Sequence, residues 1–317
     1  MTALKGIHHV TAISADAQRN VDFYAGVLGL RLVKKTVNFD DPGSYHLYYG
    51  DRVGTPGTLV TFFIWPGGTR GQNGAGEPVA LGFQVPRGSL SWWMQRLTGA
   101  GFPALDAGPR LGAGVLEVRD PDGLAVELIE SSARRDSEYW LAGGIPRDYA
   151  ITSIHSVTLS LHDEKRSAAL LSDELTFARI VSEDARLRFG LGEAGDASFV
   201  DIVKPDAPLR GRMGAGTIHH VAFRTDDDAS QRQWLKKITQ LGLHESPVMD
   251  RKYFHSIYFR EPGGVLFEIA TDGPGMAVDE PEEHLGEMLV LPQEYESLRA
   301  SLERTLPPIV SPHLVRA

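Results

Sequence analysis

The chain has 317 residues, of which 42% are hydrophobic, 23% charged and 9% aromatic, as in an ordinary soluble globular protein. This length exceeds the usual size of one hydrophobic core and predicts two cores. The net charge is −9 and lysine and arginine form no cluster, which argues against a nucleic-acid partner. The chain has no cysteine, so a metal ion would have to be held by His, Asp or Glu.

The hydropathy of the chain predicts a cytoplasmic protein with no membrane partner. No run approaches the ~18 to 20 apolar residues that a membrane-spanning helix requires. The N-terminal sequence "MTALKGIHHV" lacks the long apolar core of a signal peptide.

A unit of about 50 to 60 residues is written four times along the chain, a period at which repetition decides the architecture. Each copy predicts a strand, a helix and then several further strands, and the copies begin at "GIHHVTAIS", "PVALGFQVP", "ITSIHSVTLSL" and "GTIHHVAFRT". The predicted helices are, in order, "AQRNVDFYAGVLGL", "LSWWMQRLTGAGF", "EKRSAALLSDELTF" and "ASQRQWLKKITQLGL". The pattern predicts an α+β fold with an N-terminal half over residues 1–145 and a C-terminal half over 146–275.

The ends of the second and fourth copies align with each other. "VRDPDGLAVELIE" and "FREPGGVLFEIAT" both place a Pro and Gly turn between two strands, and each has a glutamate four residues past the glycine. These glutamates are Glu127 and Glu268. Apolar and polar residues alternate around both, which is typical of a strand with one lined face.

The last segment, 276–317, leaves the repeat. Its stretch "PQEYESLRASLERTL" has apolar residues at helical spacing and predicts an amphipathic helix. We interpret this tail as a brace against the fold in preference to a cover over an active site.

Two of the four first strands carry paired histidines, His8 with His9 and His219 with His220. Side chains alternate along a strand, so only one histidine of each pair is expected on a given face. The third copy, "SIHSV", keeps the first histidine of the pair as His155 and has serine in the second place. The first position therefore favours a packing role, and the second favours a functional one.

His9 and His220 with Glu268 make two imidazoles and one carboxylate on three strands. This is the donor set of the facial triad in non-haem Fe(II) oxygenases, with open positions for substrate and dioxygen. A single strand histidine is more often a core residue, but the recurrence in register favours a metal site. Glu127 and Ser156 favour a vestigial site without metal, because the first strand of the second copy, "VALGFQV", has no histidine.

Several stretches carry a family resemblance. "HHVTAISADAQRNVDFYAGVLGLRLVKKTVNFD", "YHLYYGDRVGTPGTLVTFF", "HHVAF" and "PGGVLFEIA" resemble the vicinal oxygen chelate superfamily. Over nearly the whole chain, including "GSLSWWMQRL" and "HLGEMLVLP", the sequence is most similar to ring-cleaving dioxygenases of the hydroquinone 1,2-dioxygenase type.

The resemblance implies four βαβββ modules in two paired-module half-barrels plus the C-terminal helical tail. It implies that modules one and four pair around the metal and that modules two and three form a metal-free pair. It also puts the metal ligands on the same trio, His9, His220 and Glu268, and gives Arg251 and Tyr258 roles beside them.

Tyr258 and Arg251 can also be read from the sequence. A three-residue hairpin loop would place Tyr258 opposite Glu268 on the same face, whereas a two-residue loop would place it on the other face. Tyr258 would then serve as a hydrogen-bond donor or acid/base, and Arg251 would stabilise an anionic ring. For His255 we favour a solvated strand edge.

Three functions compete. The first is a ring-cleaving dioxygenase that acts on an aromatic diol of hydroquinone or catechol type and O2, with Fe(II) in preference to Mn(II). The second is a glyoxalase-like isomerase or lyase, which usually has a fourth protein ligand where the strand "GTLVTFFIW" offers only Thr58 and Thr61. The third is a non-enzymatic binding protein of the same fold. In each case a homo-oligomer is left open, and Tyr45, Tyr48, Phe62 and Trp65 would line a pocket or pack the core.

Overall fold

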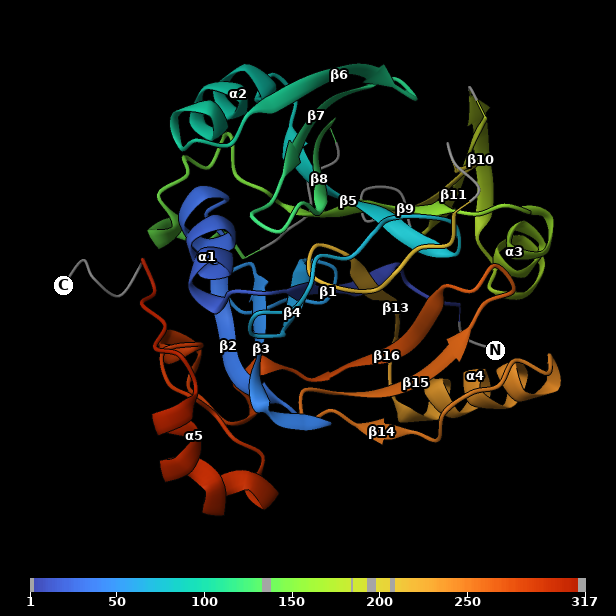
Figure 1. Ribbon diagram of the computed structural model, residues 1–317. Coiled ribbons are helices and arrows are strands. Elements are labelled where there is room, and N and C mark those ends of the chain that lie inside the picture. The colour runs from blue at the N-terminus through green and yellow to red at the C-terminus, as the bar shows by residue number, and fades with distance from the viewer. Residues whose placement is uncertain (1–2, 133–137, 184, 193–197, 206–208, 313–317) are drawn as a thin grey trace.

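The computed structural model describes residues 3–132, 138–183, 185–192, 198–205 and 209–312. The fold is α+β, with two eight-stranded curved sheets that lie side by side and helices on their outer faces (Figure 1). This agrees with the fold class predicted from the repeat.

The first sheet combines strands from the two ends of the chain, in the order β14-β15-β16-β13-β1-β4-β3-β2. Its centre is the antiparallel pairing of β1 with β13, and the last strand of each module lies parallel to the module's own first strand. The prediction that modules one and four pair is therefore confirmed. The strands are β1 (Ile7–Ser14), β2 (Arg31–Asn38), β3 (Asp41–Gly50), β4 (Leu59–Ile64), β13 (Ile218–Thr225), β14 (Met249–Asp250), β15 (Phe254–Arg260) and β16 (Leu266–Pro274).

The second sheet has the same plan, in the order β10-β11-β12-β9-β5-β8-β7-β6. Modules two and three meet through the antiparallel pair of β5 and β9. The strands are β5 (Glu77–Pro86), β6 (Ala104–Arg110), β7 (Ala113–Arg119), β8 (Ala125–Ser131), β9 (Ser153–Ser160), β10 (Ala178–Glu183), β11 (Arg186–Leu191) and β12 (Ser198–Val203).

A helix follows the first strand of each module, as the repeat predicts. Asp227 caps the longest, α4, by accepting a hydrogen bond from the Ser230 backbone N–H at 2.8 Å. Trp234 and Ile238 of α4 are fully buried, which holds the helix against its sheet. The helices are α1 (Ala17–Val21), continued by a π-helical turn over Asp22–Val27, α2 (Leu90–Gly99), α3 (Lys165–Ala169), continued by a π-helical turn over Leu170–Glu174, and α4 (Asp228–Gln240).

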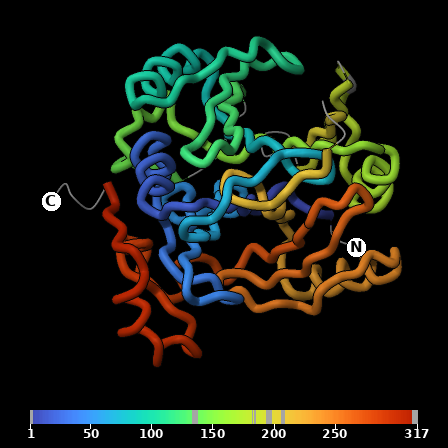
Figure 2. Tube along the Cα trace, in the orientation of Figure 1, coloured from blue at the N-terminus to red at the C-terminus, as the bar shows by residue number. Residues whose placement is uncertain are grey.

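The C-terminal segment ends in a 3₁₀ turn over Gln293–Leu298 and a short helix, α5 (Arg299–Thr305), so the regular helix is shorter than predicted. The tail, red in Figure 2, runs alongside the N-terminal strands β2 and β3. The Tyr295 hydroxyl donates to the Phe39 carbonyl at 2.8 Å, and the Tyr45 hydroxyl donates to the Pro307 carbonyl at 3.0 Å. These contacts agree with a brace.

A buried lysine fastens the start of the tail. Lys34 on β2 has no exposed surface and pairs with Asp279 at 2.6 Å and with Glu280. Asp279 also pairs with Lys252 at 2.8 Å, which ties the tail to the segment just before β15. Among the described residues, no helix is long and apolar enough to span a membrane.

Candidate metal centre

The three predicted ligands come from neighbouring strands at the centre of the first sheet: His9 on β1, His220 on β13 and Glu268 on β16. The two Nε2 atoms lie 3.3 Å apart, and the Glu268 Oε2 atom is 2.9 Å from Nε2 of His220 and 3.4 Å from Nε2 of His9. All three side chains are buried. In the part of the chain that the structure describes, this is the one group of three ligand residues close enough to share an ion.

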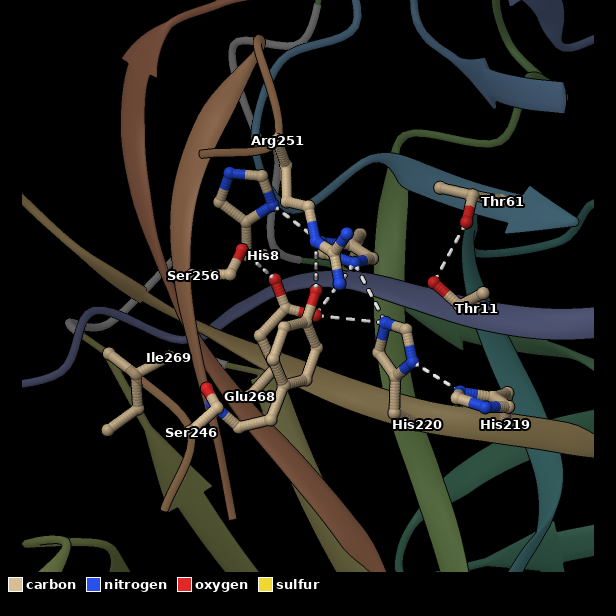
Figure 3. Close-up of polar contacts among 12 residues, drawn as sticks. His8, Thr11, Thr61, His219, His220, Ser246, Arg251, Ser256, Glu268 and Ile269 are labelled. Atoms are coloured by element: carbon tan, nitrogen blue, oxygen red, sulfur yellow. Dashed lines mark hydrogen bonds and ion pairs between the residues drawn. The ribbon is translucent and has the colours of Figure 1, made fainter. Parts of the chain in front are cut away.

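The donor chemistry of this group fits a divalent cation. Glu268 Oε2 is buried without a hydrogen bond of good geometry, while Oε1 accepts one from the Ser256 hydroxyl (Figure 3). Burial raises the pKa of Glu268, but the facing imidazoles outweigh it and hold that pKa well below its usual range. Burial lowers the pKa of His220, which keeps its imidazole neutral. An ionised carboxylate and a neutral imidazole are the forms that bind a divalent metal.

The residue before each of these histidines lies in a β-bulge. Ile7 pairs with Phe223 and His9 with Ala222, so His8 is an extra residue on β1, and His219 is the extra residue on β13 in the same way. His219 therefore lines the same cavity as His220, and the prediction of strict alternation was wrong there.

These bulge histidines contact the side chain that follows them. Nδ1 of His8 lies 2.9 Å from Nδ1 of His9. Nδ1 of His219 lies 2.7 Å from Nδ1 of His220 (Figure 3). One nitrogen of each pair carries the hydrogen and the other accepts it. Each contact fixes the orientation of the histidine that follows, and the Nε2 atom of that histidine is free for an ion when its own Nδ1 is the donor.

Tyr258 and Arg251 lie beside this group. The register pairs Tyr258 directly with Glu268, which confirms the arrangement expected from the longer hairpin loop. Arg251 Nε donates to the Tyr258 hydroxyl at 3.2 Å, and its Nη1 lies 3.3 Å from a carboxylate oxygen of Asp40. His255 lies elsewhere, 2.6 Å from Asp228 and partly exposed, as expected.

The group opens on a cavity of about 310 Å³. Benzene fits in a cavity of about 150 Å³, so a substituted aromatic ring has room here. Of the four aromatic residues considered from the sequence, Tyr48 and Trp65 line the cavity, and Tyr45 and Phe62 do not. Tyr45 and Phe62 belong to the main hydrophobic core. The sequence interpretation missed His46, Phe39, Asp40, Phe63, Phe254 and Leu266, which also line the cavity.

The position where a fourth protein ligand would lie is Thr61. Glu268 pairs with Ala222, two residues beyond His220, and Thr61 pairs with Thr11, two residues beyond His9. Thr61 is therefore the counterpart of Glu268 in module one. Its hydroxyl lies 2.8 Å from the Thr11 hydroxyl (Figure 3) and 2.9 Å from Nε2 of His46. A carboxylate ligand is absent there, as the sequence indicated.

In the second sheet the counterpart positions hold carboxylates that face arginines. Asp201 on β12 pairs with Thr158, two residues beyond Ser156, and corresponds to Glu268. Arg188 binds Asp201 in a bidentate pair at 2.7 and 2.8 Å. Glu127 pairs with Arg110 at 2.6 Å. That Glu127 and Ser156 belong to a metal-free centre stays a prediction.

His155 is the bulge residue of this second centre, and its Nδ1 lies 3.0 Å from the Ser156 hydroxyl. Burial, with the charge of Arg188 next, lowers the pKa of His155 to about 3. The unfolded chain binds a proton near pH 6.5 and the folded chain does not, so stability falls as the pH drops from about 6.5 toward 3.

We expect His155→Gln to lower the slope of unfolding free energy against pH by about 1.4 kcal/mol per pH unit between pH 6 and 4, because it removes one such proton. Urea denaturation of the metal-free protein across this range measures the slope. His244→Gln, at an exposed position, is the control and should keep the original slope. An unchanged slope in the His155 variant would show that this histidine is protonated in the folded protein.

Comparisons with known proteins agree with this geometry. The model of the Glyoxalase/Bleomycin resistance protein/Dioxygenase superfamily matches residues 6–128 and 153–269. The chain is 44% identical over 303 residues to the "Putative ring-cleaving dioxygenase MhqO" of Bacillus subtilis, covering 96% of both chains. It is 34% identical to the "Chlorohydroquinone/hydroquinone 1,2-dioxygenase" of Sphingobium indicum, again over 96% of both chains.

Solved structures support the same placement. The crystal structure of a "putative dioxygenase" from Bacillus subtilis matches with a TM-score of 0.93 and 42% identity, covering 98% of this chain and 99% of that one. Glyoxalase I from Zea mays shares the fold, with a TM-score of 0.61 and 17% identity over 84% of this chain and 92% of that one. The chain therefore belongs to the Glyoxalase/Bleomycin resistance protein/Dioxygenase superfamily.

Proposed function

We propose that this protein is a metal-dependent dioxygenase that cleaves a dihydroxylated aromatic ring and inserts both atoms of O2 into it. The observation that carries the proposal is the buried group of His9, His220 and Glu268, which opens on a cavity large enough for an aromatic ring. The names of two similar proteins refer to ring cleavage and to hydroquinone, and they support the same chemistry.

Fe(II) is the proposed metal, since two imidazoles and one carboxylate are the donor set of non-haem Fe(II) oxygenases. His9 and His220 would hold it through Nε2, and Glu268 through Oε2. When bound, the iron would supply open positions for a ring oxygen and O2 and would let electrons pass from the ring to O2.

The residues beside the metal ligands are suited to an anionic ring. Burial, followed by the charge of Glu268, raises the pKa of Tyr258, so its hydroxyl keeps its proton at neutral pH. The Tyr258 oxygen already accepts a hydrogen bond from Arg251, which leaves its own O–H to donate to a ligand. The Arg251 guanidinium adds positive charge on the same side.

Aromatic side chains complete the cavity and hold water away from the reacting ring. Phe63 lies with its ring centroid 5.3 Å from that of His219, and Phe254 lies 5.0 Å from His9. Such rings favour stacking and edge contacts with an aromatic ligand.

The test is oxygen consumption by protein loaded anaerobically with Fe(II), offered a panel of hydroquinones and catechols. We expect uptake of one O2 per ring opened, and no uptake by Fe(II)-treated Glu268→Ala. Turnover of a hemithioacetal without any oxygen uptake would favour the glyoxalase-like alternative. Binding of the rings with neither reaction would favour the non-enzymatic alternative.

A further inference from the structure

A row of hydrogen-bonded side chains crosses the first sheet on the cavity side. Thr11 pairs with Thr61 across β1 and β4, and Thr61 pairs with Tyr48 across β4 and β3. The Thr11 and Thr61 hydroxyls are 2.8 Å apart, and Thr61 lies 2.9 Å from His46 Nε2. His46 Nδ1 in turn lies 3.0 Å from the Tyr48 hydroxyl, which completes a chain of four polar groups.

The two ends of this chain both line the cavity, because Thr11, His46 and Tyr48 are among its walls. Thr61 is fully buried behind them. Within the described part of the protein, neither terminal hydroxyl has a second hydrogen-bond partner. A neutral imidazole carries one hydrogen, so the hydrogens of the chain all point one way or all point the other. When Thr11 donates inward, the Tyr48 O–H is the free donor, and it faces the cavity.

The register also relates the row to the metal ligands. Thr11 pairs with His220 on the other side of β1, so Tyr48 and His220 lie on the same line across β3, β4, β1 and β13. Three strand spacings of about 4.8 Å give roughly 14 Å along the sheet, and its curvature shortens the direct path. A ring whose first oxygen lies at the ligand group would extend into this space.

The packing of Tyr48 holds its hydroxyl in a fixed place. Its ring lies against His46 with centroids 4.2 Å apart, and Tyr253 contacts it at 5.7 Å. Only 1% of Tyr48 is exposed, so the side chain has one available orientation. The proposed reaction of the site uses neither Tyr48 nor His46.

We propose that Tyr48 is a substrate-binding residue that hydrogen-bonds the ring oxygen not held by the metal ligands, and that His46 is the positioning residue for its hydroxyl. This inference rests on the proposed function. In this proposal the second oxygen of a para-diol, at the far end of the ring, accepts the hydrogen bond of Tyr48. An ortho-diol has both oxygens at the same end and gains nothing from this residue.

The test compares two ligands that differ by one hydroxyl, hydroquinone and phenol, by calorimetry with anaerobic Fe(II)-loaded protein. We expect the original protein to bind hydroquinone about 3- to 10-fold more tightly than phenol, the effect of one neutral hydrogen bond. Tyr48→Phe should reduce this ratio to about 1 and leave phenol and catechol affinities unchanged.

Tyr49→Phe is the matched control, because Tyr49 is the next residue on β3, is equally buried and gives its hydroxyl to Asn20 at 2.8 Å in the core. It should keep the original ratio. His46→Leu should lower the ratio, and His46→Asn, with a polar atom near the Nδ1 position, should restore part of it. Equal ratios in the two His46 variants would overturn the positioning role.

A Tyr48→Phe protein that keeps the original ratio, or loses affinity for both rings equally, would overturn the binding role. So would the failure of both rings to bind the original protein. The affinity ratio requires no turnover, so an absence of oxygen uptake would count against the dioxygenase function and not against Tyr48.

Discussion

Replacing Glu268 with alanine is expected to lower the affinity of the protein for divalent metal by more than about 100-fold while the chain remains folded. A residue that hydrogen-bonds a metal ligand already contributes about 10- to 100-fold to metal affinity, and a direct ligand contributes more. Folding should persist because the change removes a fully buried charge that has no hydrogen bond at Oε2. Metal analysis after anaerobic loading and gel filtration measures the change, and His220→Ala should behave alike.

The matched control is Glu127→Ala, at the corresponding place in the second copy of the hairpin. Glu127 faces Arg110 and lies in the other sheet, so this variant should retain a full complement of metal. Stoichiometric iron in His220→Ala or Glu268→Ala would show that the metal is held by other residues.

Replacing Asp201 with alanine is expected to have the opposite profile, a large loss of stability with metal binding retained. The side chains of Asp201 and Arg188 are 1% and 7% exposed, and the pair is bidentate. Removal of one partner leaves the Arg188 charge buried and unpaired, which costs about 3–5 kcal/mol. Urea denaturation of the metal-free protein measures this loss in the free energy of unfolding.

Asp272→Ala provides the comparison for that variant. Asp272 and Arg224 form the same bidentate pair at 2.9 Å, but their side chains are 28% and 20% exposed. We expect a loss of about 1 kcal/mol or less, since water replaces the missing partner. Equal losses in the two variants would mean that burial of Arg188 does not decide the cost.

The repeat and the hairpin alignment predicted much of this architecture. The histidines of "GIHHV" and "TIHHV" predicted which side chains lie close together. They occupy the same place in two related modules, and these modules pair through those strands. His9, His220 and Glu268 accordingly lie together. The sequence allowed two lengths for the hairpin loop after Arg260, and these lengths place Tyr258 on opposite faces of the sheet. The structure has the register that pairs Tyr258 with Glu268.

Features that depend on the register between strands could not be predicted from the sequence. His8 and His219 occupy bulges that arise where β1 and β13 meet, and no local pattern in either strand shows the extra residue. His46 and Tyr48 share a face in "YHLYYG", and this spacing of two was an available signal for a polar wall. Their partner Thr61 lies on another strand, so the hydrogen-bonded chain itself required the structure.

The central claim is that His9, His220 and Glu268 together hold the metal that carries the reaction. It is tested most directly by anomalous diffraction at the iron edge from crystals grown anaerobically with Fe(II). We expect one strong peak per chain, within bonding distance of Nε2 of His9, Nε2 of His220 and Oε2 of Glu268. A peak beside other residues would contradict the claim that these three residues hold the metal. So would the absence of a peak in protein that consumes oxygen with an aromatic diol.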